Sequence, residues 1–540
     1  MKDISSTGSF IDFTLENYIY VDKTEYIPKL VKLKRVFISR PRRFGKSLTL
    51  DTIATLFETG VEPYFKGTWI YDKWTEPTYP VFRLSFLNLD NSSMDLFKKQ
   101  LNSKITEFAN KISVKGYVEK TEPEDSILSL LEKLEEETRQ IVILIDEYDY
   151  QLTSNINNDE LYKQFQQKIK RIYANIKDKF AIKFLGITGV TRLKDVSIFS
   201  VGSDINDITN ASAYSQMIGF TRDEIKKYYI DYLTLAASYE NNCRVEEVTD
   251  TQIESMLDMM AQNYDGYCFD EFYKKKVFST WSVNTFFQTM IEKKKVQFGE
   301  YWYDNGGLPS ILVNYLKTHE LNIFEYLDKD KFLKVSSDDF KNPTALTTIN
   351  QNVLMCQTGY LTLRSDLNKT STVALGIPNG EIYKALNRLL ANNIFKGNTD
   401  ITDDYGRSLL EVGTVDDIIN LFNSALNSVS YDNYPIVSES SVQNMLKLYL
   451  LGAHQEVLSE VHEAKGRADL VVNTDNKRIV FEFKYAKNET EAKSKLSEAV
   501  EQIKSRDYGN ILPKKNELLR IAAVFNADPK VRAFTEYQEV

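Results

Sequence analysis

The sequence has few of the residues that build disulfides, soft metal sites or membrane spans. It contains three cysteines with no CxxC pair, and its three histidines are scattered. An odd cysteine count without paired spacing fits a reducing compartment and argues against a disulfide scaffold or a thiolate zinc site. No apolar run approaches the roughly 20 residues that span a bilayer, and the N-terminal residues lack an export-signal pattern. We therefore expect a cytoplasmic protein with no membrane partner, and for any metal a hard, oxygen-bound ion such as Mg²⁺.

Neither sign of charge dominates the 540 residues, because 76 acidic and 67 basic side chains leave a formal net charge of -9. Nucleic-acid binding would therefore need a local basic patch and not the field of the whole molecule. Hydrophobic residues at 42% and charged residues at 26% are ordinary globular values. Because single cores stop growing near about 250 to 300 residues, we expect two to four domains.

Long proline-rich or glycine/serine-rich linkers are missing, so domain boundaries have to come from changes in pattern. Residues 1–213 alternate short apolar runs with helical patterns, which predicts a parallel sheet covered by helices. Residues 214–330 are mostly amphipathic and open with Thr221 and Glu224, which fit a helix-capping box. This second segment predicts a helical lid or connector.

The rest of the chain predicts two further parts. Residues 331–424 predict a mixed connector with strands or a hairpin around 352–363, and a winged-helix-like module is one option. Residues 425–540 predict the order helix, strand, two-strand hairpin, helix and strand. They form a second, separate α/β unit.

A phosphate-binding loop is indicated by Ser39-Arg-Pro-Arg-Arg-Phe-Gly-Lys-Ser47, which follows an apolar strand pattern and leads into a helix. In such a loop Gly45 lets the backbone approach a phosphate, Lys46 neutralises β and γ oxygens, and Ser47 ligates Mg²⁺. Arg40 stands where a first glycine normally makes the turn. By itself, a Gly-Lys-Ser triplet is also compatible with a chance turn.

A second element supports the nucleotide interpretation. The apolar run Ile141–Ile145 ends in Asp146 and Glu147, an arrangement that puts one carboxylate on Mg²⁺ and the other beside an attacking water. Farther along, Thr188 ends a strand pattern and would sense the γ-phosphate, while Arg192 would act as a charge clamp. An ordinary solvated loop would use the same two residue types.

The loop also lies in a locally basic segment. Residues 27–50 carry eight basic side chains and no acidic one. Triphosphate attraction, nucleic-acid contact or a solvated basic face would each explain this excess. The positions of Arg40, Arg42 and Arg43 inside the loop favour an anion.

A pair of carboxylates is predicted in the C-terminal hairpin. Two strand-like runs, Gly466–Val472 and Arg478–Lys484, are joined by a polar turn. With the turn centred between them, Asp469 faces Glu482, and Lys484 shares the face of Glu482 because side chains alternate along a strand. Two carboxylates about 5 Å apart at Cβ favour Mg²⁺ or Mn²⁺, which would activate a water for phosphodiester hydrolysis. A weak surface network would use the same three residue types.

The N-terminal motifs resemble those of the prokaryotic AAA-ATPase-like family. The resemblance rests on the loop above, on Ile145-Asp-Glu-Tyr-Asp149, and on Tyr20-Val-Asp-Lys-Thr24 and Gly186-Ile-Thr-Gly-Val-Thr-Arg192. That family's loop typically reads Arg-Pro-Arg-Arg-Phe-Gly-Lys-Ser, so arginine is the usual residue at the position of Arg40. The resemblance implies a P-loop ATPase fold whose nucleotide and Mg²⁺ residues are Lys46, Ser47, Asp146 and Glu147.

The C-terminal pattern resembles the PD-(D/E)XK nucleases, whose Asp…Glu-x-Lys core matches the three hairpin residues. The resemblance implies an additional acidic residue on the preceding helix, which Glu439 fits, although Glu460 also lies upstream and would flank a metal from a strand. Gln502, with Tyr508 beyond it, fits the Gln-and-Tyr signature of the same group.

The predicted site residues fall into three sets. The catalytic residues are Glu147, Asp469, Glu482, Lys484 and Gln502. The nucleotide-binding residues are Arg40, Arg43, Gly45, Lys46, Ser47, Asp146, Thr188 and Arg192. The metal ligands are Ser47, Asp146, Glu439, Asp469 and Glu482.

The combined prediction is an α/β protein with an N-terminal P-loop parallel-sheet ATPase domain, a helical middle region and a C-terminal α/β PD-(D/E)XK nuclease-like domain. We expect it to bind or hydrolyse ATP and to cleave nucleic acid with Mg²⁺ or Mn²⁺. DNA is favoured over RNA as the nucleic acid. The main alternative is a nucleotide-switched interaction or nucleic-acid-binding protein with a catalytically silent nuclease fold. A phosphotransferase is a weaker alternative, and assembly into a homo-oligomer stays open.

Overall fold

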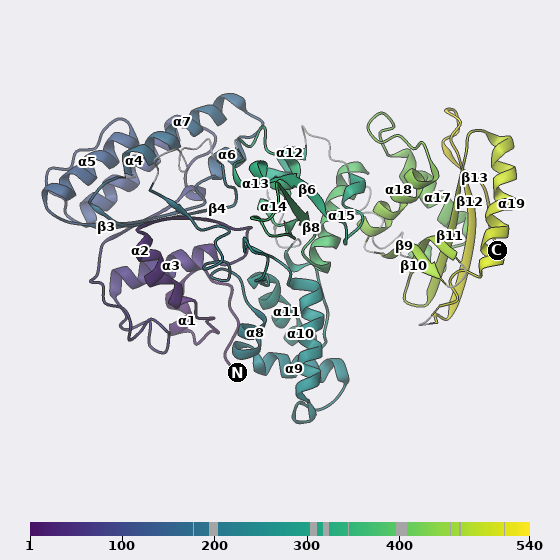
Figure 1. Cartoon of the computed structure of the whole chain (residues 1–540), viewed down its shortest axis with the longest axis horizontal. Coiled ribbons are helices and arrows are strands. Elements are labelled where there is room, and N and C mark those ends of the chain that lie inside the picture. Colours follow the sequence, from purple (N-terminus) through teal and green to yellow (C-terminus); the bar gives the residue numbers. More distant parts are fainter. Residues whose placement is uncertain are drawn as a thin grey trace. The chain divides into compact units, whose positions relative to one another are not determined.

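The chain divides into two compact units (Figure 1). The computed structural model describes all residues except 177, 194–203, 303–309, 317–322, 344, 396–407, 454, 464–465 and 512–513. The first unit comprises Met1–Leu321 and Asp330–Ile382, and the second comprises Asn322–Lys329 and Tyr383–Val540. The finer division at residues 213, 330 and 424 stays a prediction.

A five-stranded parallel sheet with the order β2-β3-β4-β1-β5 forms the centre of the first unit. Its strands are β1 (Arg35–Ser39), β2 (Val81–Ser85), β3 (Ile141–Asp146), β4 (Ile182–Gly189) and β5 (Asn206–Asp207). All of β1 and nearly all of β3 are buried, as expected for parallel strands that helices cover on both faces. The predicted α/β fold of this part is confirmed.

Helices flank the sheet on both sides (Figure 1). On one side lie α1 (Phe10–Leu15), α2 (Ile27–Leu33) and α3 (Lys46–Thr59), and on the other lie α4 (Met94–Lys111), α5 (Pro123–Glu136) and α7 (Asp159–Ile176), with α6 (Tyr150–Ser154) before α7. Short 3-10 turns occur at Thr24–Tyr26 and Phe86–Asn88.

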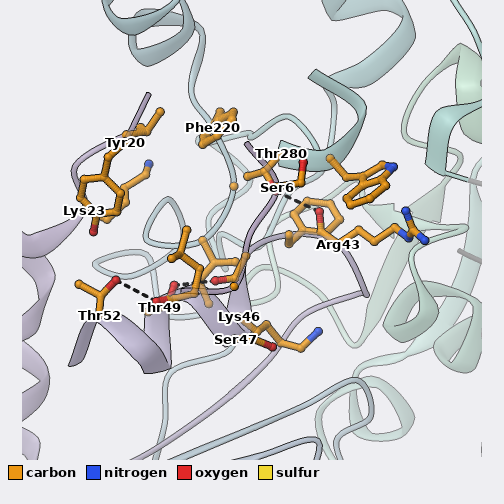
Figure 2. Close-up of a pocket in the computed structure, with 18 of the residues that line it drawn as sticks. Ser6, Tyr20, Lys23, Arg43, Lys46, Ser47, Thr49, Thr52, Phe220 and Thr280 are labelled. Atoms are coloured by element: carbon orange, nitrogen blue, oxygen red, sulfur yellow. Dashed lines mark hydrogen bonds between the residues drawn. The ribbon is translucent and has the colours of Figure 1, made fainter. Parts of the chain in front are cut away.

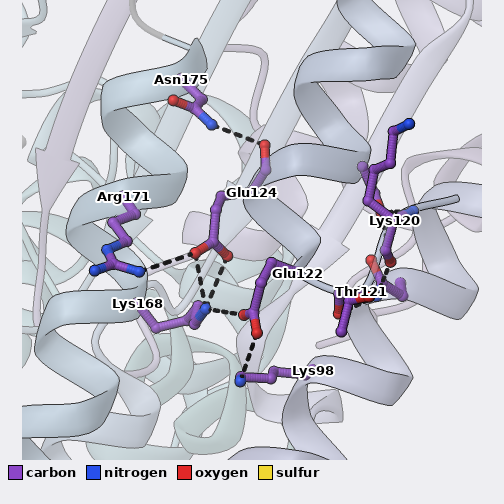
Figure 3. A network of polar contacts seen from close by, with 10 residues as sticks. Lys98, Lys120, Thr121, Glu122, Glu124, Lys168, Arg171 and Asn175 are labelled. Carbon is purple, nitrogen blue, oxygen red and sulfur yellow. Dashed lines mark hydrogen bonds and ion pairs between the residues drawn. The ribbon is translucent and has the colours of Figure 1, made fainter.

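A buried ionic network joins three of these helices (Figure 3). Lys168 of α7 is 7% exposed, and its amine lies 2.8 and 2.9 Å from the carboxylate oxygens of Glu124 at the start of α5. The same amine also contacts Glu122. Glu122 in turn pairs with Lys98 of α4 at 2.9 Å. Because a buried charge without a partner is strongly destabilising, this network fixes the three helices relative to one another.

The middle of the chain is mostly helical. Its helices are α8 (Arg222–Tyr228), α9 (Ile230–Asn241), α10 (Asp250–Tyr264), α11 (Thr280–Lys293), α12 (Ser310–Leu316), α13 (Ser337–Lys341) and α14 (Gln351–Thr358), with 3-10 turns at Val245–Glu247 and Ile323–Glu325. The predicted capping box is present, since Glu224 N–H donates to Thr221 Oγ1 at 3.2 Å and Thr221 N–H to Glu224 Oε2 at 2.8 Å. Helices α8 to α11 share one aromatic-rich core.

The prediction of strands around 352–363 is wrong for its first half. Those residues form α14, because the Asn350 side chain accepts from the N–H groups of Asn352 and Val353 and so caps the helix. Gly359, at φ 96°, ends it in the left-handed conformation. The strands that follow are short: β7 (Thr362–Leu363) and β8 (Thr372–Gly376) join β6 (Leu333–Ser336) in the order β6-β8-β7.

The second unit is built on a mixed five-stranded sheet with the order β13-β12-β11-β10-β9. Its strands are β9 (Glu456–Glu463), β10 (Gly466–Asn473), β11 (Lys477–Ala486), β12 (Glu517–Asn526) and β13 (Ala533–Glu539). The helices are α15 (Gly380–Ile394), which begins at the boundary of the two units, and α17 (Val415–Asn427), α18 (Glu439–Gly452) and α19 (Glu489–Arg506). Figure 1 shows α17 and α18 on one face of the sheet and α19 on the other. The predicted second α/β unit is confirmed, with β13 as an unpredicted addition.

The predicted hairpin register is also confirmed. Leu470 pairs with Phe481 and Val471 with Val480, and the turn closes through Thr474 N–H donating to the Lys477 carbonyl at 2.9 Å. Extending this pairing by one step places Asp469 opposite Glu482. Among the described helices, none is long and apolar enough to cross a membrane.

Candidate functional site

The Gly-Lys-Ser loop connects β1 to α3. Gly45 has φ 100°, a left-handed conformation that a residue without Cβ adopts freely, and α3 begins directly at Lys46. The Lys46 amine donates to the carbonyl oxygens of Arg40 and Pro41, both at 2.9 Å. Burial lowers the pKa of Lys46, while the nearby Asp146 and Glu147 carboxylates act to raise it. The loop therefore holds a buried amine between its own carbonyls and two carboxylates.

Asp146 brings three strand ends together. Its carboxylate accepts from Ser47 Oγ at 2.5 Å, from Thr188 Oγ1 at 2.5 Å and from the N–H of Glu147 at 3.0 Å. Ser47 follows β1, Asp146 ends β3 and Thr188 lies in β4. Ligands of parallel α/β sheets bind at such carboxyl ends of strands, so these three predicted residues share one location.

Glu147 has one buried carboxylate oxygen that accepts no hydrogen bond from the described residues. Its backbone is left-handed at φ 51°, and its Oε2 is buried with no hydrogen-bond partner among the described residues. Burial raises the pKa of Glu147, Asp146 raises it further, and Lys46 opposes the rise. A buried oxygen of this kind beside a serine hydroxyl and a second carboxylate fits the hard, oxygen-rich donor set that Mg²⁺ requires.

The three predicted arginines are all engaged by protein groups. Arg40 is 1% exposed; it donates to the carbonyls of Ser39 and Thr209 at 2.8 and 2.6 Å, and burial lowers its pKa to about 9. The Arg43 guanidinium lies 4.0 Å over the Trp281 ring. Arg192 forms an ion pair with Asp207. Arg40 thus supports the loop from inside, and a direct role of any of the three at a nucleotide stays a prediction.

A cavity of about 430 Å³ adjoins the loop (Figure 2). Lys46, Ser47 and Glu147 line it together with aromatic and apolar side chains that include Tyr20, Phe220 and Trp281. Its volume is within the range of roughly 300 to 1,000 Å³ that small-molecule sites occupy. The last two aromatic residues carry no motif, and sequence reasoning did not find them.

The middle region packs directly on the loop backbone. Thr280 Oγ1 donates to the Arg43 carbonyl at 3.0 Å, and the Trp302 indole N–H donates to the Arg42 carbonyl at 3.3 Å. Gly359 lies so close to Pro41 that a Cβ at this position would stand 2.9 Å from the Pro41 Cβ. The phosphate loop is thus held on its outer side by residues from three separate segments.

The hairpin in the second unit brings its three predicted residues together. Asp469 Oδ2 accepts from the N–H of Phe483 at 2.8 Å. The Lys484 amine lies 2.9 Å from Glu482 Oε1 and 3.5 Å from Glu439 Oε1 at the start of α18. Glu482 is fully buried, and its Oε2 has no hydrogen-bond partner among the described residues.

The electrostatics of this cluster are those of crowded carboxylates. Burial, reinforced by Asp469, raises the pKa of Glu482 to about 7, against the effect of Lys484. Burial also raises the pKa of Asp469. Burial acts to lower the pKa of Lys484, but Glu482, Glu439 and Asp469 outweigh it and raise that pKa. A further cation between Asp469 and Glu482 would relieve the repulsion.

The carboxylates of this cluster therefore fit a divalent ion, but they supply only two of its ligands. No group of three or more His, Cys, Asp or Glu side chains stands ready to hold a metal within the described part of the chain. Asp469 and Glu482, with the unpartnered Oε2, supply two carboxylates, and water or substrate oxygens would complete the six or so ligands of Mg²⁺. Glu439 reaches this pair through Lys484, and the side chain of Glu460 lies outside the described residues.

One further polar residue contacts the Asp469 strand, and two others meet at the Tyr508 hydroxyl. Gln443, four residues after Glu439 on α18, donates to the Asp469 backbone carbonyl. Gln502 Nε2 and Arg506 Nη1 lie 3.5 and 3.0 Å from the Tyr508 hydroxyl. The predicted Gln502 and Tyr508 thus lie together, whereas Gln443 and Arg506 were not predicted. The spacing of four between Glu439 and Gln443 was the available signal for the first, since it puts both on one helix face.

Together these features define two classes of domain: a parallel-sheet domain with a phosphate loop and paired carboxylates, and a sheet domain with an Asp…Glu-x-Lys cluster. Residues 5–199 match the family model described as AAA-ATPase-like, predicted AAA-ATPase. Residues 437–534 match the model of the PD-(D/E)XK nuclease superfamily. The chain carries an AAA-ATPase-like domain at its N-terminus and a PD-(D/E)XK superfamily domain at its C-terminus, and both predicted resemblances are confirmed.

Two known proteins show similarity along most of the chain. An "uncharacterized protein in vnfD 5'region" of Azotobacter chroococcum mcd 1 is 25% identical over 530 residues, which cover 95% of this chain and 94% of that protein. The crystal structure of Cdc6p from Pyrobaculum aerophilum aligns with 69% of this chain and 96% of the Cdc6p chain. The sequence identity is 11% and the TM-score is 0.24. That score is too low to define a shared arrangement.

Proposed function

We propose that this protein binds and hydrolyses ATP in its first unit. In its second unit it cleaves the phosphodiesters of nucleic acid, preferably DNA, with Mg²⁺ or Mn²⁺. The observation that carries the proposal is the assembly of two separate clusters from residues far apart in sequence. Ser47, Asp146 and Thr188 share hydrogen bonds in one, and Asp469, Glu482 and Lys484 gather in the other.

In the first cluster the chain's own residues account for binding and for positioning a water. The Lys46 amine is held by two carbonyls that triphosphate oxygens replace as acceptors, and Ser47 and Asp146 offer oxygens to Mg²⁺, which neutralises phosphate charge when bound. Glu147, with an unpartnered buried oxygen, accepts a hydrogen bond from the attacking water. Thr188, bonded to Asp146, is placed to respond to a terminal phosphate.

In the second cluster Asp469 and Glu482 would hold a divalent metal, and Lys484 would stabilise negative charge. The metal would supply polarisation of the phosphodiester and a lower pKa of a bound water. Asp469 is kept in place by the Phe483 N–H. Lys484, whose amine lies 2.9 Å from Glu482 Oε1, would stabilise the negative charge that develops on the phosphate.

A second candidate is a nucleotide-switched binding protein with a silent nuclease fold. One observation favours it: the Lys484 amine already bridges Glu482 and Glu439. In that case nucleic acid would bind without being cut.

Cleavage assays separate the two candidates. Wild-type protein is incubated with linear DNA, circular DNA or single-stranded RNA, with Mg²⁺ or Mn²⁺, and with or without ATP. Glu482→Ala should abolish cleavage while ATP binding is retained, and the exposed Glu489→Ala serves as the matched control. Lys46→Ala should abolish ATP binding, with Lys32→Ala on the surface of α2 as its control. Cleavage that needs ATP and is lost in Lys46→Ala would show coupling.

The outcomes that contradict the proposal are distinct. Cutting that persists in both Glu482→Ala and Asp469→Ala comes from a contaminant or another site. Absence of cutting on every substrate, with ATP and nucleic acid still bound, establishes the silent-fold candidate instead.

A further inference from the structure

Arg40 lies buried at the start of the phosphate loop, and the protein uses only part of its guanidinium. Nη1 donates to the carbonyls of Ser39 and Thr209 at 2.8 and 2.6 Å. Nε and Nη2 are also buried, but neither has a hydrogen-bond partner in the part of the chain that the structure describes. Leaving the buried donors of a charged group without acceptors is costly. The unused side of Arg40 therefore requires an acceptor.

A small cavity adjoins Arg40, and its lining differs from that of the cavity beside Lys46 and Ser47. Its volume is about 40 Å³. One water needs roughly 10 to 15 Å³, and small-molecule sites usually begin near about 300 Å³. The cavity thus has room for one monatomic ion or a few waters, but not for a nucleotide. Its lining includes arginines, cysteines and phenylalanines: Arg40, Arg192, Cys268, Cys356, Phe269 and Phe340.

The surroundings of this cavity carry an excess of positive charge. Neither Asp nor Glu occurs among the described residues that line it. Asp207 acts on Arg40 electrostatically, but it forms an ion pair with Arg192 and accepts from the Thr209 N–H at 2.9 Å. Two guanidinium groups therefore share one carboxylate. Because a buried charge without a counter-charge is strongly destabilising, a small anion in the cavity would stabilise this region more than a water molecule would.

The two cysteines do not supply the missing negative charge. Burial raises the pKa of Cys268 to about 11 and that of Cys356 to about 12, so both thiols stay neutral at pH 7. Apolar side chains complete the walls, since the Phe269 ring lies 4.1 Å from the Arg40 guanidinium and Phe340 also lines the cavity. Apolar walls do not replace a hydration shell. They favour a weakly hydrated anion such as chloride or bromide over sulfate or phosphate.

We propose that this cavity binds one small monovalent anion, chloride above all, and that Arg40 holds it through Nε and Nη2. The backbone carbonyl of Arg40 accepts the Lys46 amine at 2.9 Å. An anion that fixes the Arg40 side chain therefore also stabilises the start of the phosphate loop. It does so without occupying the cavity that Lys46 and Ser47 line, and the proposal does not depend on ATP hydrolysis.

The test is amide hydrogen exchange of the full chain at constant ionic strength, in sodium chloride or sodium gluconate. Gluconate is a six-carbon anion and is too large for the cavity. The measured amides are those of β1 and of Arg40, whose N–H donates to the Gly189 carbonyl at 3.2 Å. Their protection should rise with chloride concentration, by about tenfold at about ten times the Kd, because a ligand stabilises the state that binds it.

Sodium sulfate separates a bound ion from a general salt effect. Sulfate strengthens the burial of apolar surface throughout a protein. A general effect would therefore protect β1 more in sulfate than in chloride, and would act on β11 of the second unit as well. A bound chloride should protect β1 more than sulfate or gluconate does and should leave β11 unchanged.

Variants then assign the ion to Arg40. Arg40→Met keeps the length of the side chain but removes its charge and its donors, and it should abolish the effect of chloride on β1. Arg244→Met, at a position whose side chain is 80% exposed, is the matched control and should respond as wild type. Should Arg40→Met fail to fold, wild-type crystals soaked in bromide supply the assignment. Their anomalous scattering should show a peak within hydrogen-bond distance of Arg40 Nε or Nη2.

Three results would overturn the proposal. Equal protection of wild-type β1 in chloride and gluconate would mean that water alone satisfies Arg40. A chloride effect that persists in Arg40→Met would place the ion elsewhere. A bromide peak beside Arg40 without any chloride effect on wild-type protection would show an adventitious ion only.

Discussion

Replacing Glu482 by glutamine should stabilise the metal-free second unit at alkaline pH. Burial, reinforced by the Asp469 carboxylate, raises the pKa of this carboxyl from 4.5 to about 7, so the folded state binds a proton more tightly than the unfolded chain does. Stability contributed by the protonated form is present below pH 4.5 and is lost as the pH rises through 7. At 1.36 kcal/mol for each unit of pKa, the loss amounts to about 3 kcal/mol by pH 8.

Hydrogen exchange of β11 measures this effect locally, because its amides open with the sheet that holds Glu482. In a chelator-containing buffer, wild-type β11 should lose protection from pH 5 to pH 8 after correction for the intrinsic exchange rate. Glu482→Gln should not lose it, and the exposed Glu489→Gln should behave as wild type. Added Mg²⁺ should raise the protection of wild-type β11 at pH 8 and leave that of Glu482→Gln unchanged, since ligand binding stabilises only a protein that has the site. A Glu482→Gln protein that is less protected than wild type at pH 8 would refute the reasoning.

Four further outcomes follow from the contacts described. Lys168→Ala should destabilise the first unit by about 3 to 5 kcal/mol in urea unfolding, since it strands a buried carboxylate, whereas the exposed Lys170→Ala should change it little. Asp149 accepts from Thr191 N–H and Oγ1, both at 2.6 Å, and so fixes the segment after Thr188. Asp149→Ala should therefore lower the kcat of ATP hydrolysis more than it raises KM, with partial recovery in Asp149→Asn. Gly359→Ala should weaken ATP binding in calorimetry by displacing Pro41 of the loop. Gln443→Ala should slow cleavage without abolishing nucleic-acid binding, measured by gel cleavage and mobility shift.

Local sequence was enough to predict the parts whose geometry depends on neighbours along the chain. The hairpin register follows from a single turn, since side chains alternate with a period of two and one correct pair sets all the others. The phosphate loop was predictable because a strand, a glycine and a helix start stand next to one another. The expected cluster of Ser47, Asp146 and Thr188 follows from the shared edge of parallel strands.

The remaining features depend on segments that meet only after folding. Arg40 was expected at a phosphate, yet its charge is directed to the carbonyl of Thr209, which is 169 residues away in sequence. The stretch at 351–358 has apolar residues that suit either a strand or a helix, and the Asn350 cap with Gly359 decides the outcome. Both residues stand in the sequence, as the start and end signals of a helix.

The contacts between the middle region and the phosphate loop have a practical consequence. The chain has four tryptophans, and two of them touch the loop: the Trp281 ring lies under the Arg43 guanidinium, and the Trp302 indole donates to the Arg42 carbonyl. Indole emission depends on nearby charge and on hydrogen bonding at the ring nitrogen. The protein therefore carries its own optical reporter of loop movement, and phosphate binding can be followed in real time, without a label, by exciting its native fluorescence.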